Sequence, residues 1–231
     1  MRTYSERSTL EVRQLLHRLT ESSVITPPLE YRETMRRLGI AWTECFPEAF
    51  LGLERLLLVC TNEDADFLAR GILQGLKTAG GPHVSLACFW NNRASVPGSA
   101  GSRVEIAPII RRYVEPNQSE AFLVVKSIIS SACVVRTNIT ELVYEYNPSR
   151  ILVFAPVVLQ GAEDRLKQEF DEAIADRFEF FWFALDTDKK DDGEVVPGIG
   201  GSVYERLGVG SSTEKNRYIP ELVKERRHVE V

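Results

Sequence analysis

Apolar residues follow two different patterns along the chain, and each pattern predicts its own kind of element. At the start they recur every three or four positions with arginines between them, which predicts two amphipathic helices, at residues 9–20 and 29–45. Later they form short unbroken runs, which are typical of strands buried on both faces. These runs predict strands at residues 56–60, 84–90, 122–125, 151–155 and 178–185.

The segments between these strands decide the fold class. Helical patterns follow the first strand, from residues 61–64 to the Gly80-Gly81 pair, and recur at residues 162–170. Residues 133–146 are mostly β-branched or aromatic, so local propensity favours a strand there, but a parallel crossover requires a helix, and we predict a helix. Strands alternating with helices predict an α/β fold with a parallel sheet covered on both faces. The remaining expectations are a polar loop at residues 91–101 and a terminal helix, interrupted near Pro220, at residues 213–227.

Composition is that of an ordinary globular protein. The chain has 231 residues, of which 44% are hydrophobic and 26% charged, and we expect one domain. Its net charge of −5 argues against a nucleic-acid-binding surface over the whole protein. No apolar run approaches the roughly 18 residues of a membrane span, and the first residues lack the apolar centre of a signal peptide. The expected location is the cytoplasm, with no membrane partner.

Metal and disulfide chemistry are not indicated. The four cysteines lie far apart without CxxC or CxxH spacing, so we expect buried thiols at Cys45, Cys60, Cys88 and Cys133. Glu63, Asp64 and Asp66 offer the carboxylates that hard cations prefer. The spacing Thr61-x-x-Asp64 is better explained as a capping box that begins a helix. We therefore expect neither a metal nor a cofactor.

The most informative stretch is residues 122–163, which predicts a strand, a serine-rich turn, a connecting helix and a second strand. In open α/β sheets, ligands bind at the carboxyl ends of strands, where this turn lies. The turn's lysine, its serine hydroxyls and the helix amides are all donors to an anion. An ordinary loop with serine caps is equally consistent with the pattern. The candidate ligand-binding residues are Lys126, Ser127, Ser130, Ser131, Ala132 and Cys133.

A family resemblance runs along nearly the whole chain. VVPGIGGSVYERLG (residues 195–208) resembles the uracil loop of the uracil phosphoribosyltransferase branch of the type I phosphoribosyltransferases. FLVVKSIISSACV, followed by ILVFAPV, occupies the place of that family's phosphoribosyl-diphosphate (PRPP) loop and its flanking elements, and LLHRLTESSVITPPLEYRETM resembles its N-terminal arm. The resemblance implies a type I phosphoribosyltransferase-like parallel sheet flanked by helices, with an N-terminal helical arm (1–50) and a core with a C-terminal hood (51–231). It also implies a homodimer that uses the arm.

The chain departs from the family at three loops. Lys126 and Ser127 replace the Asp-Pro of the PRPP loop, and a cation cannot accept hydrogen bonds from ribose hydroxyls. Side chains replace the glycines that let the backbone approach a phosphate, at Ser131, Ala132 and Cys133. At the diphosphate-loop position stand Thr61, Asn62 and Glu63, whose carboxylate repels a diphosphate. The base-loop position, where glycine replaces the family's aspartate, holds Pro197, Gly198, Ile199, Gly200 and Gly201.

These departures predict a phosphoribosyltransferase-like protein that has lost PRPP-dependent uracil transfer. We expect it to act as a nucleotide- or partner-binding effector or regulatory subunit, with a nucleotide or phosphate ligand and protein partners in a multi-subunit system. The alternative is a divergent active phosphoribosyltransferase, or an enzyme of N-glycosidic bonds, acting on a pyrimidine nucleotide. That alternative requires carboxylates at the ribosyl centre, and it makes Glu63, Asp64 and Asp66 essential.

Overall fold

The computed structural model describes residues 1–21, 27–97, 103–116, 118–191, 193–211 and 213–227. Its strands are β1 (Arg2–Tyr4), β2 (Arg55–Thr61), β3 (His83–Asn91), β4 (Ala94–Pro97), β5 (Arg103–Ile106), β6 (Ile109–Val114), β7 (Ala121–Val125), β8 (Ile128–Ile129), β9 (Arg150–Leu159), β10 (Phe178–Asp186), β11 (Asp188–Lys189) and β12 (Val195–Val196). Its helices are α1 (Leu10–Thr20), α2 (Pro28–Cys45), α3 (Asn62–Asp64), α4 (Arg70–Thr78), α5 (Cys133–Tyr146), α6 (Ala162–Lys167), α7 (Glu172–Ala175), α8 (Val203–Arg206) and α9 (Glu221–Arg227). Three shorter helical turns are η1 (Pro47–Ala49), η2 (Ala65–Ala69) and η4 (Glu214–Arg217).

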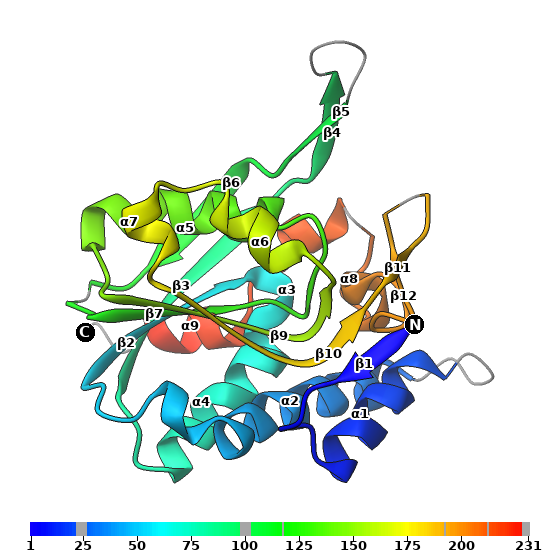
Figure 1. Cartoon of the computed structure of the whole chain (residues 1–231), viewed down its shortest axis with the longest axis horizontal. Coiled ribbons are helices and arrows are strands. Elements are labelled where there is room, and N and C mark those ends of the chain that lie inside the picture. Colours follow the sequence, from blue (N-terminus) through cyan, green and yellow to red (C-terminus); the bar gives the residue numbers. More distant parts are fainter. Residues whose placement is uncertain (22–26, 98–102, 117, 192, 212, 228–231) are drawn as a thin grey trace.

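An eight-stranded sheet forms the centre of the molecule (Figure 1). Its order is β1-β10-β9-β7-β2-β3-β6, and β8 pairs with β9. The strands from β10 to β3 run parallel, while the edge strands β1 and β6 run antiparallel to their neighbours. The predicted fold class, an α/β sheet that is mostly parallel and flanked by helices, is therefore confirmed.

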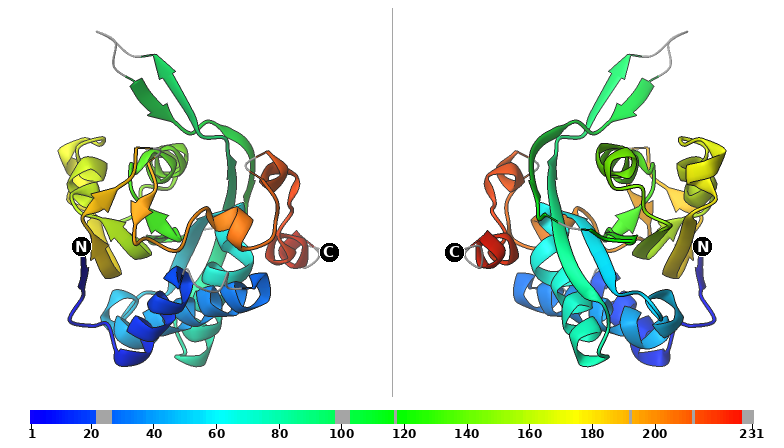
Figure 2. Two further views of the ribbon diagram at one scale, coloured as in Figure 1. Left: turned by 90° about the vertical axis from the view of Figure 1, so that its right-hand side faces the viewer. Right: turned by 90° about the vertical axis from the view of Figure 1, so that its left-hand side faces the viewer.

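Alternate residues of the central strands enter two separate cores. In β2, Leu56 and Leu58 pack into a core shared with α1, α2, α4 and α9. Leu57 and Val59 point to the other face, where the core is closed by α5, α6 and α7. Figure 2 shows these two helical layers on opposite sides of the sheet. Burial on both faces explains why the central strands are apolar runs without alternation.

The predicted arm packs as a cover over the sheet. The apolar stripe of α1 and α2 is buried in the first core, and it includes Leu16, Tyr31 and Trp42. The apolar face predicted for the two arm helices therefore packs against the chain's own sheet. A dimer through the arm stays a prediction, as does the division of one domain into an arm (1–50) and a core with a hood (51–231).

Helix α5 is the element for which topology and local propensity disagreed. It spans Cys133–Tyr146, as the parallel crossover requires, and it buries Val135, Ile139 and Leu142 against the sheet. It ends at Asn147, whose φ of 44° is a left-handed cap, directly before a proline. Burial of one face therefore outweighs the strand propensity of its β-branched residues.

Two expectations about local structure were wrong. Part of the expected polar loop at residues 91–101 is strand β4, which pairs with β5 in a ribbon that projects from the body (Figures 1 and 2); residues 98–101 lie outside the described part. Val96 lies opposite Val104 in this ribbon. The glycine and proline residues of the segment made a loop the expected structure, and this cross-strand pair was therefore missed. Strand β1 was not predicted, since its three residues have no apolar pattern.

The C-terminal segment and the cysteines agree with the expectations from the sequence. The terminal helix is divided at Pro220 into η4 and α9, and the four cysteines are buried free thiols. Among the described residues, no helix combines the length and apolar character needed to cross a membrane.

Candidate functional site

The sheet reverses its winding between β2 and β7. From β2 the chain proceeds outward to β3 on one side, while β7, β9 and β10 extend to the other side. In open α/β sheets, the crevice outside the carboxyl ends of the strands at such a point is the usual ligand site. Glu63 and Asp64 follow β2 there, and Lys126 and Ser127 follow β7. Two loops that lie 63 residues apart in sequence therefore meet at one place.

Asp64 is the centre of the contacts between these two loops. Its carboxylate accepts hydrogen bonds from the Lys126 ammonium (2.7 Å), the Ser127 backbone N–H (3.1 Å) and the Thr61 hydroxyl (2.6 Å). The residue is only 1% exposed. The predicted capping box is wrong in this respect, because the Thr61 hydroxyl donates to a carboxylate and caps no backbone N–H. Asp64 joins β2 to β7 instead of starting a helix.

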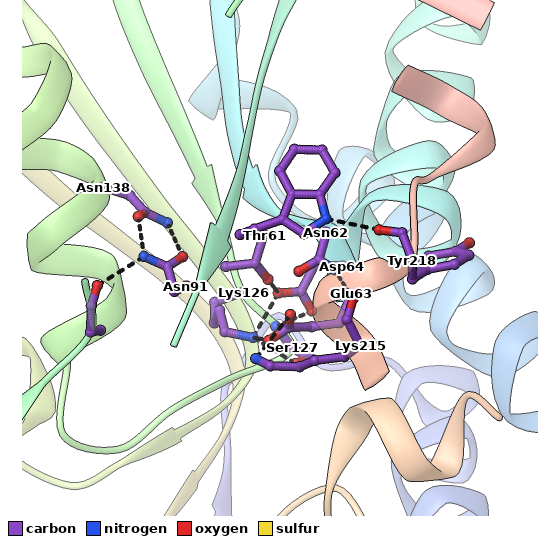
Figure 3. Close-up of polar contacts among 12 residues, drawn as sticks. Thr61, Asn62, Glu63, Asp64, Asn91, Lys126, Ser127, Asn138, Lys215 and Tyr218 are labelled. Atoms are coloured by element: carbon purple, nitrogen blue, oxygen red, sulfur yellow. Dashed lines mark hydrogen bonds and ion pairs between the residues drawn. The ribbon is translucent and has the colours of Figure 1, made fainter. Parts of the chain in front are cut away.

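Glu63 extends this cluster toward the C-terminal segment. Its two carboxylate oxygens lie 3.4 Å from Lys126 Nζ and 3.5 Å from Lys215 Nζ. Figure 3 shows the side chains of Glu63, Asp64, Lys126 and Lys215 directed toward one another. Two carboxylates and two ammonium groups thus form one buried ion-pair cluster of balanced charge, which we call the Lys126 cluster.

Burial and ion pairing act in opposite directions on these groups. Burial raises the pKa of Glu63, but Lys126 and Lys215 outweigh it and hold that pKa below its ordinary value. Burial lowers the pKa of Lys126, but the Asp64 and Glu63 carboxylates outweigh it and raise that pKa. Both groups are therefore charged at neutral pH, and each holds the other in its ionised form.

The hood reaches the cluster through η4. The Asn62 side-chain amide donates to the backbone carbonyl of Lys215 (2.7 Å), and Lys215 Nζ lies 5.1 Å from the centre of the Tyr204 ring. Asp66, the third carboxylate of this segment, is turned elsewhere: it accepts from the backbone N–H groups of Glu221 (2.9 Å) and Leu222 (2.8 Å) at the start of α9. Glu63 and Asp64 thus belong to the site, and Asp66 anchors the hood.

The serine-rich turn after β7 leads into the N-terminus of α5. Ala132 directly precedes the helix with a φ of 61°, a conformation that favours glycine. The Ser131 hydroxyl accepts from the Arg93 guanidinium (3.1 Å) and donates to the Cys133 sulfur (3.3 Å). The turn therefore keeps the backbone shape of a glycine turn, while side chains from other segments approach it.

A cavity of about 830 Å³ opens above this turn. Nine of the predicted site residues line it: Glu63, Lys126, Ser127, Ser130, Ser131, Ala132, Cys133, Ile199 and Gly201. All three predicted loops therefore reach one cavity. Five predicted residues are not among those that line it: Thr61, Asn62, Pro197, Gly198 and Gly200.

Further lining residues were not predicted as site residues. They include Arg93, Glu105, Lys189 and Lys215, which come from the ribbon, the β11–β12 hairpin and the hood. Tyr204 and Glu205, which follow the base-loop position, line the cavity as well. Lys215 had no local signal, since it stands in a charged terminal segment and its burial depends on contact with Glu63 across 152 residues. Within the described part of the chain, no group of His, Cys, Asp and Glu side chains is arranged to hold a metal ion.

The base loop, residues 197–201, forms one wall of the cavity and rests on the arm. The Tyr31 hydroxyl of α2 donates to the backbone carbonyl of Ile199 (3.1 Å). Gly200 has a φ of 80°, and a Cβ atom there would lie 1.9 Å from the carbonyl oxygen of Leu19. Such close contact requires glycine, so Gly200 serves the packing of the loop backbone against α1.

No protein-family model and no curated protein matches this sequence. Among solved structures, AQ2163 protein from Aquifex aeolicus aligns over 90% of this chain and 99% of its own, with a TM-score of 0.66 and 13% identity. A hypoxanthine phosphoribosyltransferase from Staphylococcus aureus aligns over 68% of this chain and 76% of its own (TM-score 0.40, 14% identity). APRTase from Giardia lamblia aligns over 72% and 85% (TM-score 0.36, 9% identity). The chain therefore shares its α/β fold with AQ2163 protein over almost the full length of that structure.

Proposed function

We propose that this chain is a phosphoribosyltransferase-like protein, related to the uracil branch, that does not transfer phosphoribosyl groups and binds a nucleotide in its cavity as an effector or regulatory subunit. The observation that carries the proposal is the Lys126 cluster. At the position where ribose hydroxyls need an acceptor, the chain has a donor that is bonded to Asp64 and Glu63. The cavity offers room for a nucleotide, but the residues at the PRPP-loop and diphosphate-loop positions are engaged with one another.

Retention of a phosphate site is supported by the turn before α5. Ala132 keeps a positive φ, which costs about 1–2 kcal/mol for a residue with a Cβ atom. The first residues of this 14-residue helix line the cavity, and Ser131 and Arg93, which are bonded to each other, line it beside them. Backbone strain of this kind persists where the surrounding structure imposes it, and an anion at the helix N-terminus is the simplest use of it.

The first test measures binding and transfer separately. Isothermal titration with uridine 5′-monophosphate and with ribose 5-phosphate should show binding of both, while incubation with PRPP and uracil should yield no nucleotide above background. Turnover of PRPP with uracil would overturn the proposed loss of transfer. Absence of binding for both phosphates would overturn the proposed nucleotide site.

A matched pair of variants locates the phosphate. Ser131→Ala removes a hydroxyl that lines the cavity, and we expect about a tenfold weaker affinity for ribose 5-phosphate, the value of one hydrogen bond to a charged group. Ser149→Ala is the control, because its hydroxyl bonds the Glu120 carbonyl at the other end of the sheet. Equal affinities for both variants would exclude this turn as the phosphate site. Lys126 is unsuitable for this test, since its removal leaves two buried carboxylates unpaired.

The alternative enzyme is favoured by one observation, the ionised carboxylate of Glu63 at the cavity wall. Such a carboxylate is able to stabilise a developing oxocarbenium ion during cleavage of an N-glycosidic bond. Incubation with pyrimidine nucleotides, followed by chromatography of the free base, tests this function. Base release that disappears in Glu63→Gln would establish the enzyme, whereas a nucleotide recovered intact supports the effector.

Assembly is part of the same proposal. A homodimer and a protein partner in a multi-subunit system both follow from the effector role, and native mass spectrometry of the chain purified from its own cells tests both. A mass of two chains, or a stoichiometric second protein, is the expected result. A monomer with no companion would contradict a subunit role.

A further inference from the structure

The first residues of the chain contact the base loop directly, through a buried ion pair. Arg2 lies in β1, and Asp186 is its direct partner across the antiparallel pairing with β10. The guanidinium donates from Nε to one carboxylate oxygen of Asp186 (2.8 Å) and from Nη2 to the other (2.7 Å). The side chains of Arg2 and Asp186 are 9% and 0% exposed. This two-point geometry is the strongest form of contact between these groups.

The same two side chains hold both polar groups of one residue in the base loop. The Gly198 N–H donates to Asp186 Oδ2 (2.8 Å), and its carbonyl oxygen accepts from Arg2 Nη2. Gly198 takes a φ of 59°, and a Cβ atom there would lie 2.2 Å from the Val195 carbonyl oxygen. The loop therefore turns sharply at Gly198, and the ion pair determines how its donor and its acceptor are directed.

Attachment of β1 to the sheet does not explain this arrangement. The strand is already paired with β10 in register over residues 2–4, and the Ser5 N–H donates to the Phe183 carbonyl (2.9 Å). A buried ion pair carries a desolvation cost that an apolar pair would avoid, so stability alone is weak grounds for it. The ion pair instead sets the orientation of the Gly198 backbone, because Asp186 accepts from its N–H and Arg2 donates to its carbonyl oxygen.

We propose that Arg2 and Asp186 are positioning residues for the base loop, which makes β1 part of the ligand site. Beyond Gly198, the loop continues to Ile199 and Gly201, which line the cavity. The Tyr31 hydroxyl of α2 donates to the carbonyl of Ile199, the next residue along the loop. With the loop held at Gly198 and at Ile199, the wall that faces a nucleobase is formed before the ligand arrives, and less ordering cost falls on binding.

This inference rests on the proposed nucleotide site, and the choice of probes separates the two. Ribose 5-phosphate carries the sugar and phosphate alone, whereas uridine 5′-monophosphate adds the base that the loop would contact. A change in the position of the loop should therefore weaken the binding of uridine 5′-monophosphate and leave the binding of ribose 5-phosphate unchanged. A group that merely stabilises the fold would affect both probes alike.

The test variant is Arg2→Lys, which keeps the charge but cannot hold the carboxylate at two points and the Gly198 carbonyl together. We expect about a tenfold rise in the dissociation constant for uridine 5′-monophosphate and less than about a twofold change for ribose 5-phosphate. The matched control is Arg150→Lys, since Arg150 makes the same two-point contact with Glu179 between β9 and β10, where 30% and 40% of the side chains are exposed. The control should leave both constants unchanged.

A second variant and a second measurement keep the test decisive if the buried charge of Asp186 disturbs folding. The double variant Arg2→Met with Asp186→Leu removes both charges at once, so no unpaired ion remains. Hydrogen exchange of the peptide covering residues 197–201 should become faster in both variants, while exchange in the central strand β2 stays as in the wild type.

Each outcome decides between the possibilities. Unchanged affinity for uridine 5′-monophosphate in both variants, with unchanged exchange of the loop, would overturn the proposed positioning. Equal weakening of both probes would also overturn it, as an effect on the whole fold. If the wild type binds the two probes equally well, the loop does not contact the base, so this inference fails while the proposed nucleotide site stands. If it binds neither, both fail.

Discussion

Replacement of Lys126 by methionine tests the Lys126 cluster most directly. Methionine preserves most of the volume of the lysine stem but removes the ammonium group, which leaves Asp64 and Glu63 without their shared cation. Loss of one partner from a buried ion pair costs about 3–5 kcal/mol. Asp64 keeps its bonds from the Thr61 hydroxyl and the Ser127 N–H, and Glu63 keeps Lys215. We therefore expect the free energy of unfolding to fall by about 3 kcal/mol, the lower end of that range.

Urea denaturation at pH 7, followed by the fluorescence of the buried Trp42 and Trp90, measures this free energy. The control is Lys224→Met, whose exposed pair with Glu221 should be worth less than about 1 kcal/mol. Adding Asp64→Asn to Lys126→Met removes one unpaired charge, so the double variant should be more stable than the sum of the two single changes implies. A Lys126→Met protein within about 0.5 kcal/mol of the wild type would refute the reasoning.

Two further predictions concern pH and the base loop. Because its folded pKa is lowered, Glu63 contributes its full stability above about pH 4.3, the unfolded value, and loses it as the pH falls through the folded pKa. Without Lys126 this contribution shrinks, so urea midpoints of the wild type and Lys126→Met should lie closer at a pH below about 4, where the wild type loses the contribution, than at pH 7. Gly200→Ala forces a Cβ atom against the Leu19 carbonyl and should lower the melting temperature by more than Gly52→Ala, which has a similar φ of 79° and nothing within 4 Å.

The sequence predicted the parallel sheet and its helices well, because burial on both faces leaves a strong local pattern. The clearest case is residues 133–146, where the requirement of a parallel crossover for a helix outweighed the strand propensity of Val134, Val135 and Ile139. Strand β1 carries no such pattern. Its place depends on backbone pairing with β10, where Arg2 lies opposite Asp186, 184 residues away, and no local rule indicates that pairing.

The candidate site was predictable only in part, for the same reason. Positions of the three loops followed from strand ends and from family resemblance, and they converge on one cavity. Partners within the site were not predictable, since Glu63 and Asp64 had a sufficient local explanation as the acidic first turn of a helix. Lys215 is buried only because the hood packs against Glu63 in the folded chain, and no sequence pattern in residues 213–227 predicts that burial.

The paired charges also change how the departures from the phosphoribosyltransferase pattern are understood. Taken singly, a lysine at the PRPP-loop position and a glutamate at the diphosphate-loop position are separate losses, each unfavourable for its own ligand group. In the folded chain these residues contact each other, and Lys126 compensates both Glu63 and Asp64. Removing either side chain alone would leave a buried charge without its ion-pair partner, Asp64 in one case and Lys215 in the other. Under the proposed function, the two loops are coupled through their charges, and we expect that a change in one loop alone will disturb the cluster without producing phosphoribosyl transfer.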